Sequence, residues 1–215
     1  MKKLILILSF LSILFISSCK EKVSFEEKIS QLRPTTLFYE NDDFLLTAFP
    51  EKSENPQIDD GNIGNVENRI LFKLQLKSKK HELCKVEFCI NDKTYKANFK
   101  YQPLSSFLYC EIQVANLPTK NLYVKVSLDE KTCGISLLSH KNDLTLSYQQ
   151  VIDNLIKNDE FVKEFLSNKN GELKIRFIDN GGYDYWYLGF VSAEKTTAYL
   201  IDGETGEILA IKPQK

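Results

Sequence analysis

Apolar and polar side chains alternate with a period of two over much of the chain between Phe38 and Leu138. Such alternation is typical of extended strands that bury one face, because successive side chains point to opposite sides. Several short segments carry it, with turn residues between them: Phe44 to Phe49, Ile70 to Leu76, Leu83 to Ile90, Thr94 to Tyr101, Phe107 to Val114 and Leu122 to Leu128. The pattern predicts an antiparallel β-sandwich over residues 37–140.

The apolar spacing becomes helical near Ser147. Ser147 and Gln150 form a capping box, in which each side chain satisfies a free backbone donor, and a helix interrupted by a polar break at Asn158-Asp159 is expected up to Gly171. Further strands are predicted after it: Leu173 to Ile178, Tyr185 to Ser192, Thr197 to Ile201 and Ile208 to Lys212. The expected fold class is mainly β with α+β, the sandwich being followed by a small helix-plus-antiparallel-sheet domain at residues 147–215.

The first nineteen residues have the pattern of an export signal. Lys2 and Lys3 precede an apolar run from Leu4 to Ile16, which is too short to span a bilayer comfortably. The tetrapeptide Ile16-Ser17-Ser18-Cys19 resembles the lipobox of bacterial lipoproteins, in which the cysteine thiol is coupled to diacylglycerol after the signal is removed. The alternatives are a plain secretory signal and an uncleaved anchor. The resemblance implies a signal peptide at residues 1–18 and a protein held through lipidated Cys19 on the extracytoplasmic face of a bacterial membrane.

Two other segments are polar. Residues 19–36 are expected to be a lipidated tether, in which Phe25, Ile29 and Leu32 at helical spacing favour a stalk or a short helix lying on the first domain. The acidic segment from Pro50 to Asn68 is rich in turn residues. It is expected to be a solvated loop, although a calcium site is the alternative, without the spacing of an EF-hand.

Charge argues against nucleic acid as a partner. Without residues 1–18 the chain has 26 basic and 29 acidic side chains, so it is slightly acidic. Arginine occurs only as Arg33, Arg69 and Arg176, and arginine makes the bidentate phosphate contacts that nucleic-acid readers use.

Four cysteines remain besides Cys19: Cys84, Cys89, Cys110 and Cys133. Strand alternation places Cys84 and Cys110 toward the core, where they form either a disulfide or two buried thiols, and places Cys89 on the polar face. No two of them have the close spacing of a zinc site, so no metal or cofactor is expected.

Three runs stand out in the C-terminal segment: Trp186-Tyr187-Leu188-Gly189-Phe190-Val191, Ala198-Tyr199-Leu200-Ile201-Asp202 and Thr205-Gly206-Glu207-Ile208-Leu209. With these residues the segment resembles the PepSY domain. In that family a helix precedes an antiparallel sheet, and an aspartate, a threonine and a glycine form the last hairpin. The structural residues of this hairpin would be Asp202, Thr205 and Gly206. Lys85 to Asp92 is similar to strands of immunoglobulin-like modules of bacterial surface proteins, a resemblance of architecture without their cysteine and tryptophan framework.

The PepSY resemblance implies a non-catalytic protein-binding module, since such domains are proposed to restrain or regulate peptidases near the cell envelope. Strand alternation turns Tyr185 and Tyr187, with Tyr183, outward as candidate partner-binding residues. Trp186 has two interpretations, a place in a partner-binding face or, with Leu188 and Phe190, a place in the core against the helix.

No catalytic motif is recognisable in the sequence. It has no G-x-S-x-G, no H-E-x-x-H and no P-loop, and His81 and His140 are expected to be exposed surface residues. The paired carboxylates at 26–27, 42–43 and 59–60 are interpreted as solvated charges. We therefore expect a binding protein and not an enzyme, with a small-molecule or cell-wall ligand as the alternative to a protein partner.

Overall fold

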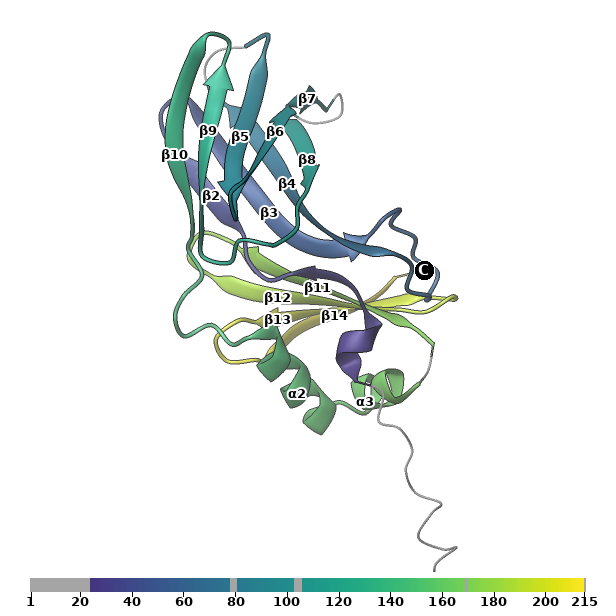
Figure 1. Cartoon of the computed structure of the whole chain (residues 1–215). Coiled ribbons are helices and arrows are strands. Elements are labelled where there is room, and N and C mark those ends of the chain that lie inside the picture. The colour runs from purple at the N-terminus through teal and green to yellow at the C-terminus, as the bar shows by residue number, and fades with distance from the viewer. Residues whose placement is uncertain (1–23, 78–80, 103–105, 169, 215) are drawn as a thin grey trace, which may run out of the picture.

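The computed structural model describes residues 24–77, 81–102, 106–168 and 170–214, and the fold is mainly β (Figure 1). The predicted signal and Cys19 lie outside the described residues. The strands are β1 (Ile29–Arg33), β2 (Leu37–Glu40), β3 (Phe44–Glu54), β4 (Val66–Leu76), β5 (Cys84–Ile90), β6 (Lys93–Asn98), β7 (Lys100–Tyr101), β8 (Leu108–Gln113), β9 (Asn121–Leu128), β10 (Lys131–Ser139), β11 (Glu172–Asp179), β12 (Asp184–Val191), β13 (Thr196–Asp202) and β14 (Ile208–Gln214). The helices are η1 (Phe25–Lys28), α2 (Tyr148–Asn158) and α3 (Glu160–Ser167).

Two hydrophobic cores divide the molecule into two lobes. The first lobe contains β2 to β10, and its core is built from buried side chains of these strands. Among them, the rings of Phe72 on β4 and Phe88 on β5 lie 5.4 Å apart between centroids. Cys84 and Cys110 are buried in this core as free thiols, whereas Cys89 is exposed, as alternation predicts.

The second lobe consists of β11 to β14 with α2 and α3 on one face (Figure 1). The capping box at Ser147 and Gln150 starts α2 as predicted. The helix is however divided, because Asp159 ends α2 and its side chain accepts a hydrogen bond from the backbone of Val162 to start α3. Trp186 is 1% exposed and donates to the carbonyl of Leu146 at 3.0 Å, so it belongs to the core.

One strand connects the lobes. Residues 29–33 were expected in a stalk or short helix on the first domain, but they form β1, which pairs in parallel with β11 and antiparallel with β3. Ile29 packs in the core of the second lobe, with Phe25 and Leu32 against the same core. The helical spacing was misleading because the free edges of β11 and β3 satisfy the backbone of β1. All strands are thereby linked in one hydrogen-bonded sheet.

The segment from Pro50 to Asn68 is also less open than expected. β3 continues to Glu54 and β4 begins at Val66, so only residues 55–65 connect them. This connection lies against the second lobe, where Asp59 pairs with Lys174 and the backbone of Gly61 donates to Glu172 at 3.0 Å. Gly61 has φ +80°, and a Cβ atom there would lie 2.9 Å from the backbone of Ala193. The prediction of a solvated loop therefore holds for the exposed residues 55–60 and 62–65, and it was wrong for Gly61 and for the strand residues on either side.

Candidate functional site

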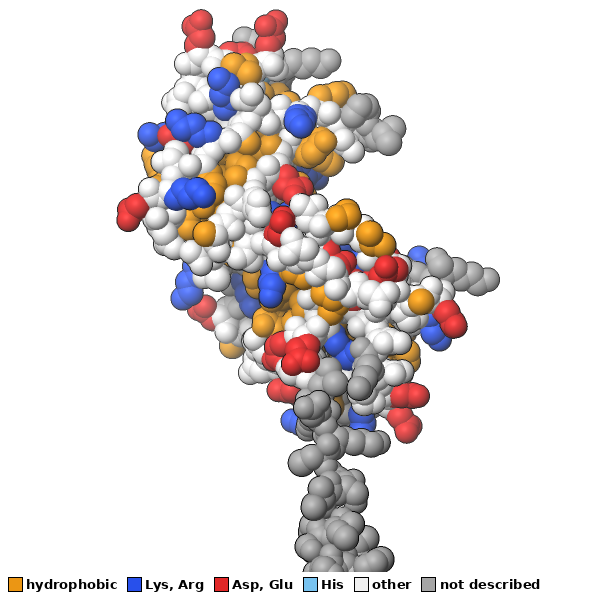
Figure 2. Space-filling model, turned by 45° about the vertical axis from the view of Figure 1, so that its right-hand side comes forward, with side chains coloured by type: hydrophobic (Ala, Val, Ile, Leu, Met, Phe, Trp, Pro, Cys, Tyr) orange, Lys and Arg blue, Asp and Glu red, His pale blue; other side chains and the backbone are white. Residues whose placement is uncertain are grey.

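The face of the second-lobe sheet that points away from α2 and α3 carries the predicted partner-binding tyrosines. Trp186 and Leu188 point into the core, so Tyr185 and Tyr187 on the same strand take the opposite face, where both are half-buried. Tyr183 precedes β12 in the turn and is 69% exposed. We call this surface of β11 to β13 the open face. In Figure 2 the surface is hollowed on the right-hand side, between the upper and lower parts of the molecule.

Arg176 and Tyr187 form the centre of the open face. They are register partners on β11 and β12, and the guanidinium carbon of Arg176 lies 5.4 Å from the centroid of the Tyr187 ring. The ring lies along the sheet, because a Cβ atom on Gly189 would be 3.0 Å from the Tyr187 hydroxyl. The glycine therefore leaves space for the tyrosine to lie flat under the arginine.

Arg176 is a cation that forms no direct ion pair among the described residues, although the more distant charges of Glu51 and Asp59 act on it. Its Nε donates to Oε1 of Gln31 at 2.7 Å, and within the described ranges no ion pair includes it. Burial, followed by the positive charge of Arg33, lowers the pKa of Arg176. An anionic group brought to this position would offset both effects and would find a planar donor beside an aromatic ring.

The neighbouring arginines are, by contrast, held by Glu51. Arg33 Nη2 lies 2.6 Å from Glu51 Oε2, and Arg69 Nε lies 3.3 Å from Oε1 of the same carboxylate. Burial alone would raise the pKa of Glu51, but the charges of Arg33 and Arg69, together with hydrogen bonds from Arg33 and Ser53, lower it overall. The group Gln31, Arg33, Glu51, Arg69 and Arg176, which we call the junction network, contains all three arginines of the chain.

A groove of about 550 Å³ borders this network between the lobes. Arg33 lies over the ring of Phe49, at 4.6 Å from its centroid, and the exposed ring of His140 contacts that of Phe38 in a tilted arrangement, with 3.7 Å between centroids. Ile178, 37% exposed, faces the groove from β11. The charged groups of the lining are Arg33 and the carboxylates of Glu40 and Asp179. An apolar surface with a few polar groups is the usual composition of a small-ligand site.

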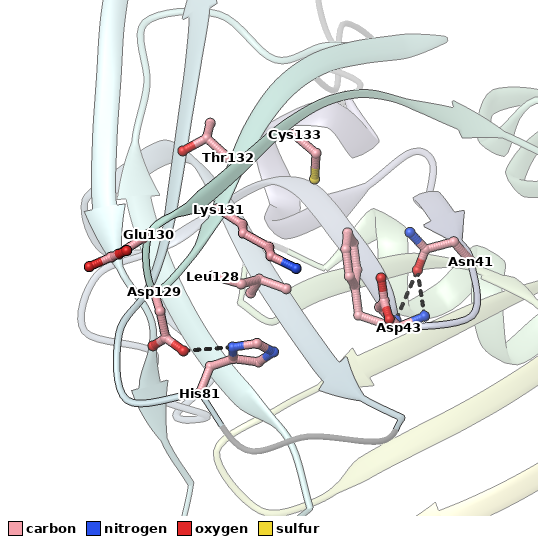
Figure 3. Close-up of a pocket in the computed structure, with 10 residues that line it drawn as sticks. Asn41, Asp43, His81, Leu128, Asp129, Glu130, Lys131, Thr132 and Cys133 are labelled. Carbon is pink, nitrogen blue, oxygen red and sulfur yellow. Dashed lines mark hydrogen bonds and ion pairs between the residues drawn. The ribbon is translucent and has the colours of Figure 1, made fainter.

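A separate hollow of about 840 Å³ lies at the far end of the first lobe (Figure 3). His81 was expected to be exposed, but its side chain is only 17% exposed and its Nδ1 lies 2.8 Å from Asp129 Oδ2. The His81 side chain lies against Asp129 because the backbone N–H groups of Glu82 and Leu83, the next two residues, also donate to Asp129 Oδ1. The hydrogen bond from Leu83, together with that from His81, lowers the pKa of Asp129.

This hollow contains a cysteine, a histidine and an aspartate, but the histidine is not placed to take the proton of the cysteine thiol. Cys133 lies on the side opposite His81, and Lys131 extends between them (Figure 3). The Cys133 thiol donates to the carbonyl of Val126 at 3.7 Å, and burial raises its pKa, so the reactive thiolate is disfavoured. The His81–Asp129 pair therefore connects two turns and does not activate this thiol.

The last hairpin has the geometry of a hydrogen-bonded turn. Asp202 Oδ1 accepts from the backbone of Glu204 at 3.0 Å and of Thr205 at 2.8 Å, and the bond from Thr205 lowers the pKa of Asp202. Gly206 has φ +75° and donates to the carbonyl of Asp202 at 3.0 Å. These residues hold β13 and β14 together.

Sequence reasoning missed the junction network. Glu51 and Ser53 were included in a predicted loop, and β1 was not recognised, so nothing indicated that the three arginines meet. A signal was present in the alternation Leu45, Thr47, Phe49, Glu51, Ser53, which continues the outward face of β3 past the predicted strand end.

Comparisons with known proteins give no relative. No family model matches the chain, and neither a curated protein nor a solved structure matches it significantly. In the described part of the chain no helix is both long and apolar enough to cross a bilayer. No group of three or more potential metal ligands occurs among the described residues.

Proposed function

We propose that this protein is a lipid-anchored extracytoplasmic lipoprotein of the bacterial envelope that binds a protein partner and does not itself catalyse a reaction. In this proposal an immunoglobulin-like β-sandwich precedes a PepSY-like domain, and the partner is an envelope peptidase, the class that the PepSY resemblance implies. The observation that carries the proposal is the open face, where Arg176 lies over Tyr187 and forms no ion pair with any described residue.

Residue type supports a protein partner. Tyrosine and arginine are enriched among the residues that contribute most to protein interfaces. Tyr187 and Arg176 are already ordered by Gly189 and Gln31, so little side-chain freedom remains to be lost on binding. Tyr183 extends the same surface at the turn before β12.

The proposed anchor would leave this surface accessible. Four residues lie between Cys19 and Ser24, the first described residue, so the five Cα-to-Cα steps from Cys19 to Ser24 span at most about 18 Å. Ser24 and η1 lie next to α3 on the helical side of the second lobe (Figure 1). A lipid on Cys19 would hold the helices toward the membrane and turn the open face and the first lobe away from it.

The test is capture from envelope extracts with the chain from Lys20 on and with matched variants. Tyr183→Ala and Tyr187→Ala should each lower the amount of retained peptidase, whereas Tyr101→Ala should not, although Tyr101 is 66% exposed. Thermal melts followed by circular dichroism would check that the variants fold. Equal capture by all four proteins would contradict the proposal.

A second candidate is a small-molecule or cell-wall ligand bound in the groove between the lobes. The groove of about 550 Å³, with Phe38, Phe49 and Ile178 beside Arg33, favours it. A ligand that raises the melting temperature of the wild-type protein, but not of Phe49→Ala, would support this alternative.

A further inference from the structure

The outer edge of the second-lobe sheet is apolar and exposed. β14 pairs only with β13 and ends the sheet (Figure 1). Ile208, Leu209 and Ile211 are 41%, 50% and 51% exposed, and every residue from Glu207 to Pro213 is exposed. An exposed edge strand has unpaired backbone donors and acceptors and is a ready template for another strand.

The side chains along this edge complement themselves. The sequence Glu207-Ile208-Leu209-Ala210-Ile211-Lys212 begins with an acid and ends with a base. If two such strands pair antiparallel about a point between Leu209 and Ala210, Glu207 of each copy lies opposite Lys212 of the other, and Ile208 lies opposite Ile211. Opposite charges and large apolar residues in directly opposed positions stabilise strand pairs.

The faces of the strand agree with this register. Ile208 and Ile211 pair with Ile201 and Tyr199, which are in the core beneath the helices, so both isoleucines are on the helical face. They share that face, although they are three residues apart, because a register shift leaves Leu209 as an extra residue. Lys212 pairs with Ala198 and lies on the open face, as does Glu207, which precedes Ile208. Each opposed pair is therefore on one side of the sheet.

We propose that β14 pairs with β14 of a second copy of this chain, in antiparallel register with Glu207 opposite Lys212. The two-fold axis would run perpendicular to the sheet, so α2 and α3 of both copies would lie on the same side. Ser24 of each copy would then also be on that side, and two anchored chains could meet on one membrane. The pairing depends only on β14 and is independent of what the open face binds.

Charge reversal tests the register. Sedimentation equilibrium of the chain from Lys20 on should show a reversible dimer. With Lys212→Glu, both charge pairs of the dimer become pairs of opposed carboxylates, and the dissociation constant should rise about tenfold. Glu207→Lys, which creates two pairs of opposed ammonium groups, should have the same effect. The double variant Glu207→Lys/Lys212→Glu restores the opposed charges and should recover the wild-type dissociation constant to within about threefold. Lys125→Glu, an exposed lysine of the first lobe, is the matched control and should change nothing.

Two results would overturn the proposal. The first is a wild-type chain that stays monomeric at a chain concentration of about 100 μM, which would place any dimer dissociation constant well above that concentration. The β14 edge would then be free or would bind another protein. The second is a dimer whose dissociation constant is the same in both single variants, because another surface would then form it. Far-UV circular dichroism of each variant would show that β14 remains folded.

Discussion

Arg33 Nη2 on β1 lies 2.6 Å from Glu51 Oε2 on β3, and through this contact the connecting strand is attached to the first lobe. The same carboxylate holds Arg69 from β4. Glu51 is 4% exposed, so its charge is compensated by protein groups and hardly by water.

The first prediction concerns this carboxylate. Glu51→Gln should lower the free energy of unfolding by about 3 kcal/mol, because the partly buried Arg33 would lose its counter-charge and Arg69 would keep only that of Glu111. Urea denaturation measures the change. Glu111→Gln is the matched control, since Glu111 pairs with Arg69 but is 46% exposed, and it should cost less than about 1 kcal/mol. Similar losses in the two variants would show that burial of Glu51 contributes nothing.

The acid stability of the protein should depend on the same residue. The pKa of Glu51 is lowered in the folded state, so the stability it provides is complete above the unfolded pKa of about 4.3 and is lost as the pH falls toward the folded pKa. Urea midpoints measured from pH 6 down to pH 3 should fall more steeply for wild type than for Glu51→Gln. Parallel curves would refute this assignment.

At alkaline pH the expected determinant is Tyr199. Its hydroxyl donates to Asp159 Oδ2 at 3.0 Å, and burial with this neighbouring carboxylate raises its pKa to about 12. Its contribution to stability is present below pH 10 and is lost as the pH rises toward 12. Tyr199→Phe should cost about 1 kcal/mol at neutral pH and flatten the alkaline loss. Tyr101→Phe, at an exposed site, should leave the pH profile unchanged.

Thiol labelling should separate the cysteines by position. Cys89, exposed on β5, should react first with a maleimide, and Cys133 should follow slowly because burial raises its pKa. Cys84 and Cys110 are buried, and burial raises the pKa of Cys110 to about 12, so both should react only on unfolding. Mass spectrometry of labelled peptides against time measures the order. Early labelling of Cys110 would contradict the packing of the first lobe.

The parts of the fold that a local pattern determines could be predicted. Alternation located β3, β5 and β9 because each buries one face, and the capping box located the start of α2. β1 could not be found in this way, since its strand character comes from β11, a partner more than a hundred residues away in the sequence. The same long-range pairing brings Arg33 beside Arg176, so the candidate site was predictable only in its tyrosines.

The pairing of β1 with β11 also determines the order in which the two lobes can fold during biosynthesis. Residues 29–33 are synthesised early, whereas β11, their parallel neighbour, follows only after the whole first lobe. The first lobe can pack while the chain is still emerging, but the second lobe must wait for its last strands and then accept a strand made at the start. A fragment that begins at Ser147 would lack this strand and would expose the β11 edge. A fragment that contains the open face and folds on its own therefore has to include β1 as well as β11 to β14.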